Sequence, residues 1–265
     1  MPQTKDLEKL RETLIKETAE KVKKTFQSKE FHIIKAISCY EDMHKVYNLL
    51  AEHAIDWYSL HFPELKRIVE SNEEILKCIL LGNRKNYSSK TISFCKNAEA
   101  ILKAANESIG AEIDEASLKQ IQHIAKLALD CKKEIEEIKK YIEKKANETM
   151  PNFAELSGSI LAAKLLAAAG SLEKLAKMPS STLQLLGAEK ALFRHLRKKT
   201  KPPKYGYILQ HPLIKSLPKS KRGKMARSLA AKLSIAAKED FYGKGKIAEK
   251  LKVELEKRFE KLKMK

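Results

Sequence analysis

Basic side chains recur at helical spacing between residues 187 and 198. Lys190, Arg194 and Arg197 are separated by four and three residues, so a helix there presents all three on one face. Gly187 and Ala188 open this helix, and the free backbone N–H groups at a helix start favour phosphate oxygens. Because both residues are small, they leave room for a phosphate backbone to come close. The segment therefore predicts contact with a polyanion.

The residues that follow add hydrogen-bond donors and stacking surfaces. Lys201-Pro202-Pro203-Lys204 predicts an extended basic loop, because proline cannot continue a helix. Lysine, tyrosine, glutamine and histidine side chains beyond it suit phosphates and unpaired bases. The candidate RNA- or partner-binding residues are Gly187, Ala188, Glu189, Lys190, Arg194, Arg197, Lys201, Lys204, Tyr205, Gln210, His211, Arg222, Lys224 and Arg227. Each alone is as consistent with an ordinary solvated side chain, and their density within about forty residues is the signal.

The charge distribution supports this interpretation. The chain has 53 Lys or Arg and 34 Asp or Glu, a formal charge of +19. Residues 1–150 carry 26 basic and 25 acidic side chains, whereas residues 151–265 carry 27 basic and 9 acidic ones. A folded segment with such an excess repels itself, so a polyanionic partner is the economical explanation. Nucleic acid is favoured over an anionic membrane surface or simple high-pI solubility.

The sequence carries no signature of catalysis. GxGxxG, GxxxxGK[ST], HExxH and GxSxG are all absent, and paired acids such as Glu136-Glu137 lie in charged helical sequence. The four cysteines form no CxxC pair, and a Cys39–His44 metal site is far less expected than a structural histidine beside a buried cysteine. We therefore predict a non-enzymatic protein with no catalytic residue, metal or cofactor. No apolar run approaches the length needed to cross a membrane, and a soluble, intracellular protein is expected.

The composition predicts an all-α fold. Ala, Leu, Ile, Lys and Glu dominate, and 9 Gly and 8 Pro are too few for the turns of a sandwich or barrel. Helical spacing predicts helices over 4–26 and 29–60, with a new helix starting near Pro63 and ending at Gly82. The predicted domains are an N-terminal helical region (1–65), a long antiparallel coiled-coil dimerisation arm (66–150) and a compact basic helical domain (151–265).

The arm prediction rests on one apolar stripe. Residues 88–109 and 114–146 are expected to form an antiparallel helical hairpin around the connection at Gly110. Apolar residues in the second helix recur at alternating gaps of three and four, close to the 3.5-residue period of a coiled coil. The candidate dimerisation residues are Leu118, Ile121, Ile124, Cys131, Ile135, Ile138 and Ile142. A homodimer is the simplest partner for so thin an arm, and packing on the chain's own body is the alternative.

Four helices are expected in the basic domain. Residues 157–169 are rich in Ala and Leu and predict a buried packing helix. Helices over 188–198 and 219–238 follow, and Leu192, Phe193 and Leu196 are expected to face the core. Between these two helices, residues 207–209 predict buried extended chain. A last charged amphipathic helix is expected over 247–263.

Several ungapped motifs give the sequence a family resemblance. The longest is LGAEKALFRHL at 186–196, accompanied by KLAKMPSST at 174–182, KYGYI at 204–208, QHP at 210–212, RGKMAR at 222–227 and, upstream, WYSLHFPEL at 57–65. In this order, over about residues 30–260, they resemble the Nop domain family. The resemblance is strongest to its archaeal branch, the core proteins of box C/D small ribonucleoproteins. The spliceosomal branch is more distant because it departs from the GAEKALF motif.

The resemblance implies a scaffold. In that family the Nop domain binds a kink-turn guide RNA together with a small kink-turn-binding protein, and the coiled coil joins two scaffolds. The N-terminal region holds fibrillarin, which methylates ribose 2′-hydroxyls. Family members usually have a mixed α/β domain before the first helix, and here only about 25 residues precede Lys29, so fibrillarin docking is the least secure implication. A cytoplasmic location is expected in an archaeal cell, and a nucleolar one in a eukaryote. The alternatives are a spliceosomal-type small nuclear ribonucleoprotein component and a basic membrane-surface protein.

Overall fold

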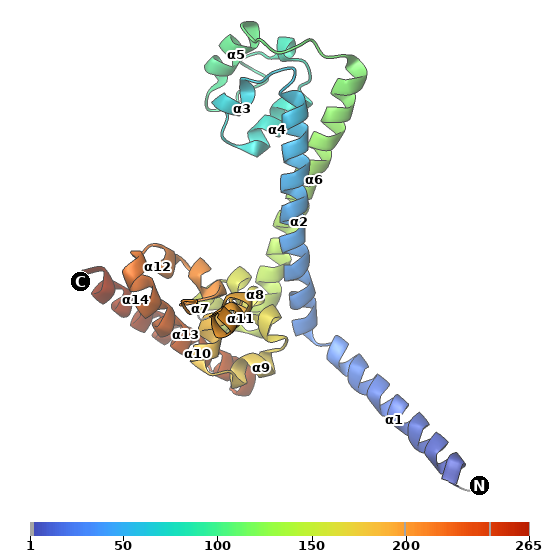
Figure 1. Cartoon of the computed structure of the whole chain (residues 1–265), viewed down its shortest axis with the longest axis vertical. Coiled ribbons are helices and arrows are strands. Elements are labelled where there is room, and N and C mark those ends of the chain that lie inside the picture. Colours follow the sequence, from blue (N-terminus) through green and yellow to red (C-terminus); the bar gives the residue numbers. More distant parts are fainter. Residues whose placement is uncertain (1–2, 199, 244, 265) are drawn as a thin grey trace. The chain divides into compact units, whose positions relative to one another are not determined.

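The computed structural model describes residues 3–198, 200–243 and 245–264, and within them the regular structure is helical with no β-strand (Figure 1). The all-α prediction is confirmed. In chain order the α-helices are α1 Gln3–Phe26, α2 Lys29–Tyr58, α3 Leu65–Ile68, α4 Asn72–Leu80, α5 Ala98–Asn106, α6 Glu115–Thr149, α7 Pro151–Ser157, α8 Ser159–Ala169, α9 Leu172–Lys177, α10 Ser180–Leu185, α11 Glu189–Lys198, α12 Pro212–Lys215, α13 Lys219–Tyr242 and α14 Ala248–Met264. Two 3₁₀ turns are η1 Arg84–Asn86 and η2 Tyr207–Gln210.

The chain forms two compact units. The tip unit comprises residues 39–138, and the basic unit comprises residues 1–38 and 139–265. The tip unit has 13 basic and 17 acidic side chains, which gives it a net charge of −4. Because the whole chain has a net charge of +19, the basic unit has a net charge of 19 + 4 = +23. Helices α2 and α6 each run from one unit into the other. The predicted domain boundaries at residues 66 and 151 differ from the unit boundaries at residues 39 and 139, and the predicted domains remain predictions.

The two long helices pair in antiparallel fashion inside each unit. In the tip unit the Cys131 thiol on α6 lies 3.5 Å from the Met43 carbonyl oxygen on α2. In the basic unit Lys29 and Glu148 form an ion pair with 3.4 Å between Nζ and Oε2. The predicted hairpin of residues 88–109 with 114–146 is therefore wrong, because α2 supplies the helix that runs along α6.

Residues 88–97 fold as turns and not as the first half of a helix. The Ser88 backbone N–H donates to the Thr91 hydroxyl at 2.9 Å, and the Thr91 hydroxyl donates back to the Ser88 carbonyl at 3.0 Å. Such local side-chain bonds compete with helix formation. The helix begins only at Ala98, and its Ile101 is buried.

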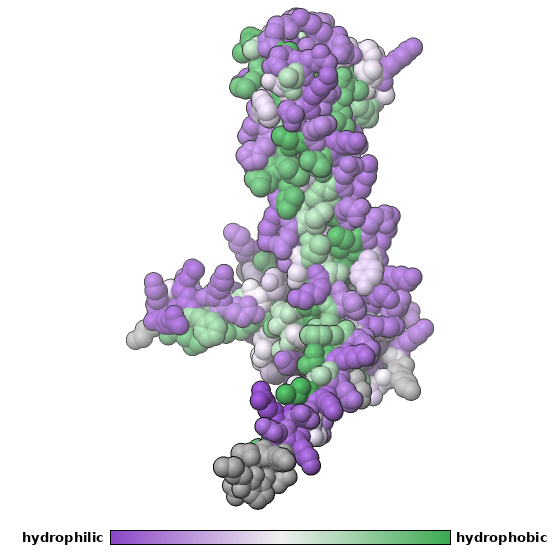
Figure 2. Space-filling view, turned by 90° about the vertical axis from the view of Figure 1, so that its right-hand side faces the viewer, coloured by the Kyte–Doolittle hydropathy of each residue, from purple (hydrophilic) through white to green (hydrophobic). Residues whose placement is uncertain are grey.

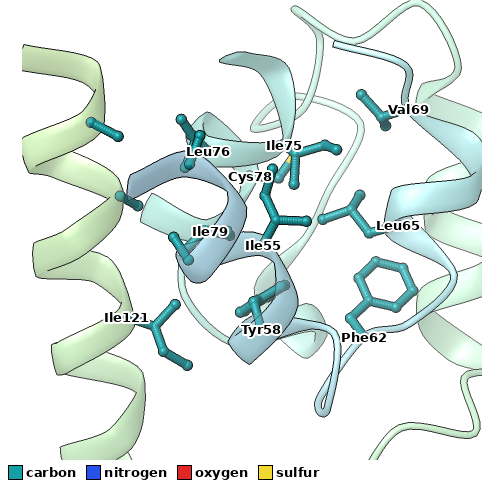
Figure 3. Close-up of a cluster of buried hydrophobic side chains, with 14 of the residues drawn as sticks. Ile55, Tyr58, Phe62, Leu65, Val69, Ile75, Leu76, Cys78, Ile79 and Ile121 are labelled. Atoms are coloured by element: carbon teal, nitrogen blue, oxygen red, sulfur yellow. The ribbon is translucent and has the colours of Figure 1, made fainter. Parts of the chain in front are cut away.

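A core of aromatic and aliphatic side chains fills the tip unit (Figure 3). Tyr58, at the end of α2, is 1% exposed and donates its hydroxyl proton to the Gly82 carbonyl at 2.7 Å. Burial raises the pKa of the Tyr58 hydroxyl well above its ordinary value. The single helix predicted from Pro63 to Gly82 is divided into α3 and α4, because Val69 is extended and the Ser71 side chain caps α4 by accepting from the Glu74 N–H.

In the basic unit α13 packs against α7, α9, α10, α12 and α14. The predicted packing helix is present as α8, with Leu165 and Leu166 fully buried. Half-buried Asp240 on α13 accepts hydrogen bonds from the Asn152 and Phe153 backbone N–H groups at 3.0 and 2.8 Å. The Asn152 side-chain oxygen accepts from the Ile247 N–H at 2.8 Å. This network joins α7, α13 and the start of α14.

Candidate nucleic-acid interface

Helix α11 lies on the surface of the basic unit and has no buried residue. The predicted basic face is present, because Lys190, Arg194 and Arg197 are all exposed. The prediction that its apolar residues face the core is wrong for two of the three: Leu192 is half-buried, but Phe193 is 59% and Leu196 is 67% exposed. The helix therefore presents both positive charge and large apolar side chains to its surroundings. Phe193 and Leu196 are candidate site residues that the sequence analysis did not include. The available signal was their position directly before Arg194 and Arg197 in the sequence.

The start of α11 is occupied by the chain itself. Gly187 has a φ of +86°, and a Cβ there would overlap the Tyr207 ring. The Glu189 carboxylate accepts a hydrogen bond from the Gly187 N–H at 2.7 Å. The space that we expected Gly187 to leave for a phosphate backbone is thus filled by Tyr207, and an acid holds the local amide. In this structure Gly187 and Glu189 position the start of α11.

The following loop is fixed against the residues that precede α11. Gly206 donates its N–H to the Gln184 carbonyl at 2.9 Å, and Tyr207 donates to the Leu186 carbonyl at 2.8 Å. Residues 207–210 form a 3₁₀ turn instead of the predicted extended chain, with Ile208 buried. These bonds hold Lys201, Lys204 and Tyr205 on the same stretch of surface as α11, with the two lysines exposed and the tyrosine half-buried.

His211 does not present a free ring to a partner. It is 8% exposed, its Nε2 donates to the Leu156 carbonyl at 3.0 Å, and its Nδ1 accepts from the Leu213 N–H at 3.2 Å. Burial lowers the pKa of the imidazole, and the bond to Leu156 opposes that shift in part. In this structure His211 caps α12, and its expected binding role stays a prediction. Gln210 is exposed, and its side-chain oxygen accepts from Lys164 Nζ at 3.2 Å.

Helix α13 divides its predicted basic residues between two roles. Arg222 is half-buried and donates to the Leu217 carbonyl at 2.7 Å and to the Lys215 carbonyl at 3.0 Å. Its guanidinium is therefore engaged with the backbone of the preceding turn, which corrects its expected place on the surface. Lys224 and Arg227 are exposed. Among the described residues no cluster of His, Cys, Asp or Glu suits a metal ion.

The predicted dimerisation stripe is buried within the chain. Ile121, Cys131, Ile135 and Ile142 are all less than 9% exposed in the monomer. The other three stripe residues, Leu118, Ile124 and Ile138, are half-buried. The stripe is thus the seam between α6 and the rest of its own chain. Exposed apolar residues on α2 and α6 include Val46, Leu49 and Leu127, and Figure 2 shows green apolar areas on one face of the molecule.

Comparison with known families agrees with the resemblance carried by the sequence motifs. A model of the Nop family, described as "snoRNA binding domain, fibrillarin", matches residues 39–261. The chain belongs to the Nop family. The match includes both the tip unit and the part of the basic unit that carries α11. Within the described residues of this Nop protein, no helix has the length and apolar character of a membrane span.

Relatives occur in archaea and eukaryotes. An uncharacterized NOP5 family protein of Methanocaldococcus jannaschii is 44% identical over 94% of this chain and 61% of its own length. Nucleolar protein 58 of Rattus norvegicus is 38% identical over 80% of this chain and 40% of its own. A solved structure described as a fibrillarin/Nop5p complex is 28% identical, covering 96% of this chain and 77% of that one, with a TM-score of 0.49. The chain thus spans about two fifths to three fifths of the length of these curated relatives.

Proposed function

We propose that this protein is a non-catalytic scaffold of an archaeal-type box C/D ribonucleoprotein. It binds a kink-turn guide RNA together with the small protein that sits on the kink-turn. The contact surface is α11 with the 201–205 loop, extended by Lys224 and Arg227. Membership of a family described as an RNA-binding domain supports this proposal. So does the +23 charge of the basic unit, since phosphate contacts supply most of the affinity of such proteins.

The observation that carries the proposal is the mixed character of α11. Lys190, Arg194 and Arg197 suit phosphates, whereas exposed Phe193 and Leu196 suit an apolar protein surface. A purely RNA-binding helix has little use for two bulky apolar side chains in solvent. A composite of RNA and protein uses both kinds of side chain at once.

The proposed role in modification is recruitment. The family description and the name of the solved complex both include fibrillarin. In our proposal fibrillarin supplies the ribose 2′-O-methyltransferase activity, and the present chain supplies the position of the RNA. A homodimer through the arm brings two such positions together. Its interface consists of the exposed apolar residues Val46, Leu49 and Leu127, since the stripe on α6 is already buried.

The direct test measures RNA affinity across a salt series. Kink-turn RNA loaded with its small protein is titrated with wild type, Lys190→Ala and Arg194→Ala. Each lost phosphate contact is expected to reduce the slope of log K against log salt by about 0.7–0.9. Lys252→Ala is the matched control, an exposed lysine on α14 outside the proposed surface. Slopes and affinities equal to wild type for both α11 variants would place the RNA elsewhere.

A further inference from the structure

Three large apolar side chains are exposed near the end of α2 in the tip unit. Trp57 is 39%, Leu60 is 69% and Ile109 is 90% exposed. The Ala111 N–H donates to the Leu60 carbonyl at 2.9 Å, so the chain that carries Ile109 runs beside the chain that carries Leu60. Trp57, Leu60, Ala111 and Ile113 also line a small pocket of about 220 Å³. We call Trp57, Leu60, Ile109 and this pocket the tip patch.

The backbone that displays Ile109 is held firmly. The Glu64 carboxylate accepts hydrogen bonds from the Ser108 hydroxyl at 2.7 Å and from the Ile109 N–H at 3.1 Å. Buried Arg84 donates to the Gly110 carbonyl at 2.9 Å. A Cβ at Gly110 would overlap the His61 carbonyl oxygen, so the two chains are in close contact. Ile109 is therefore exposed on a fixed support and not on a loose loop, which is the arrangement of a preorganised binding surface.

The surroundings of the tip patch are acidic. Residues 52–64 and 107–115 contain no Lys or Arg and seven acids: Glu52, Asp56, Glu64, Glu107, Glu112, Asp114 and Glu115. Lysines from outside these segments pair with three of them, namely Lys66 with Asp56, Lys85 with Glu112 and Lys119 with Glu115, each at 2.7 Å. Counting these lysines and Arg84, the net charge is 4 − 7 = −3 in a chain of +19. Phosphate groups are repelled from such a surface.

We propose that the tip patch is a docking site for a second protein, through a segment that carries a bulky apolar side chain flanked by Lys or Arg. The apolar side chain enters the pocket beside Trp57 and Leu60, and the basic side chains face the surrounding carboxylates. Buried aromatic anchors and complementary charge are the usual sources of affinity and specificity in such interfaces. This partner is distinct from the guide RNA, whose proposed surface lies in the other unit.

Site-specific photo-cross-linking identifies the segment that occupies the patch. One variant of the full chain carries a benzophenone amino acid in place of Ile109. A separate control variant carries it in place of Val253, an exposed apolar residue on α14. After irradiation in cells, mass spectrometry of the cross-linked peptide is expected to give a segment of another protein with at least two Lys or Arg within four residues of the cross-link. Cross-linking mainly to RNA, mainly to a second copy of this chain, or no more strongly than from position 253 would overturn the proposal.

Binding of the synthesised peptide then tests the chemistry. Fluorescence anisotropy with the full chain is expected to show affinity that falls with added salt and at least tenfold weaker binding to Leu60→Asp and Ile109→Asp. Val253→Asp is expected to bind like wild type, and circular dichroism establishes that each variant is folded. Equal affinity of all four chains would contradict the proposal. Unchanged RNA affinity of Ile109→Asp is also expected, so failure of this inference is distinct from failure of the scaffold function.

Discussion

Gly187 connects the basic helix to the loop that follows it. Its φ of +86° is one that side-chain-bearing residues rarely adopt, and the Tyr207 ring lies where a Cβ would be. A glycine at this point therefore serves close packing of the chain on itself. The exposed cations of α11 are held in place by this contact and by the bonds from Gly206 and Tyr207 to the preceding turn.

Gly187→Ala is expected to lower the free energy of unfolding by about 1–3 kcal/mol from backbone strain alone. The clash with the Tyr207 ring adds to this loss. Thermal unfolding followed by circular dichroism measures the change. Gly223→Ala is the matched control, since Gly223 lies inside α13 and no atom lies within 4 Å of an added Cβ. There alanine is expected to raise stability by up to about 1 kcal/mol. Equal effects of the two substitutions would contradict the packing role of Gly187.

His211 is expected to make stability depend on pH. Burial lowers its pKa from the ordinary 6.5, so the unfolded chain takes up a proton at a higher pH than the folded chain does. The stabilisation is complete above about pH 7 and is lost as pH falls through 6.5 towards the lower pKa of the folded state. Denaturant unfolding between pH 7.5 and 5.5 is expected to show this loss in wild type and a flatter profile in His211→Gln. Parallel profiles for both chains would assign the pH dependence to other groups.

At the scale of elements, the periodicity of apolar residues predicted where the helices form better than it predicted which helices pack together. The gaps of three and four in α6 correctly marked a buried stripe, with Ile121 and Ile135 fully buried. Which helix covers that stripe is a long-range choice, and α2 carries a suitable face of its own, with Ala51, Ala54 and Ile55 in the same core. Spacing within one segment contains no information about that choice.

The candidate site follows the same division. Spacing was sufficient to place Lys190, Arg194 and Arg197 on one helical face, because they depend only on local geometry. Burial of His211 and the backbone bonds of Arg222 depend on carbonyl groups positioned by other turns. Sequence patterns therefore do not distinguish these two residues from exposed polar residues. Exposure of Phe193 and Leu196 likewise depends on the absence of a covering element near α11, which local patterning does not reveal.

Two substitutions on the arm separate folding from dimerisation. Ile135→Glu places a carboxylate where the side chain is fully buried, so it is expected to cost several kcal/mol of stability. Leu127→Glu changes an exposed residue and is expected to leave the melting temperature nearly unchanged while shifting the mass from dimer to monomer. Circular dichroism and light scattering measure the two effects. A folded Leu127→Glu chain that keeps its dimeric mass would exclude this surface from the interface.

At the scale of the whole molecule, the two units carry opposite net charge, −4 in the tip unit and +23 in the basic unit. Polyanions are therefore attracted to one unit and not to the other. This separation is consistent with our proposals, in which the basic unit holds the RNA with its small protein and the tip unit holds a further protein.

The scaffold proposal predicts that the purified chain alone transfers no methyl group from S-adenosylmethionine to RNA. Radiolabelled methyl incorporation into a guide–target pair measures this. Addition of fibrillarin, the small kink-turn-binding protein and a guide RNA to this chain is expected to give methylation at the guided ribose. Incorporation by the chain without fibrillarin would show that the protein is itself an enzyme.

The division of α2 and α6 between the units has a consequence for the order of events during synthesis. Residues 39–138 are contiguous, so the whole tip core in Figure 3 is synthesised before the second part of the basic unit, residues 139–265. The basic unit must wait, because Glu30 near its beginning accepts a hydrogen bond from the Leu172 N–H, 142 residues later, at 2.7 Å. The part of α2 before Cys39 therefore makes its contacts with the later part of the basic unit only after the tip segment has been synthesised, and contacts of such long sequence separation close last.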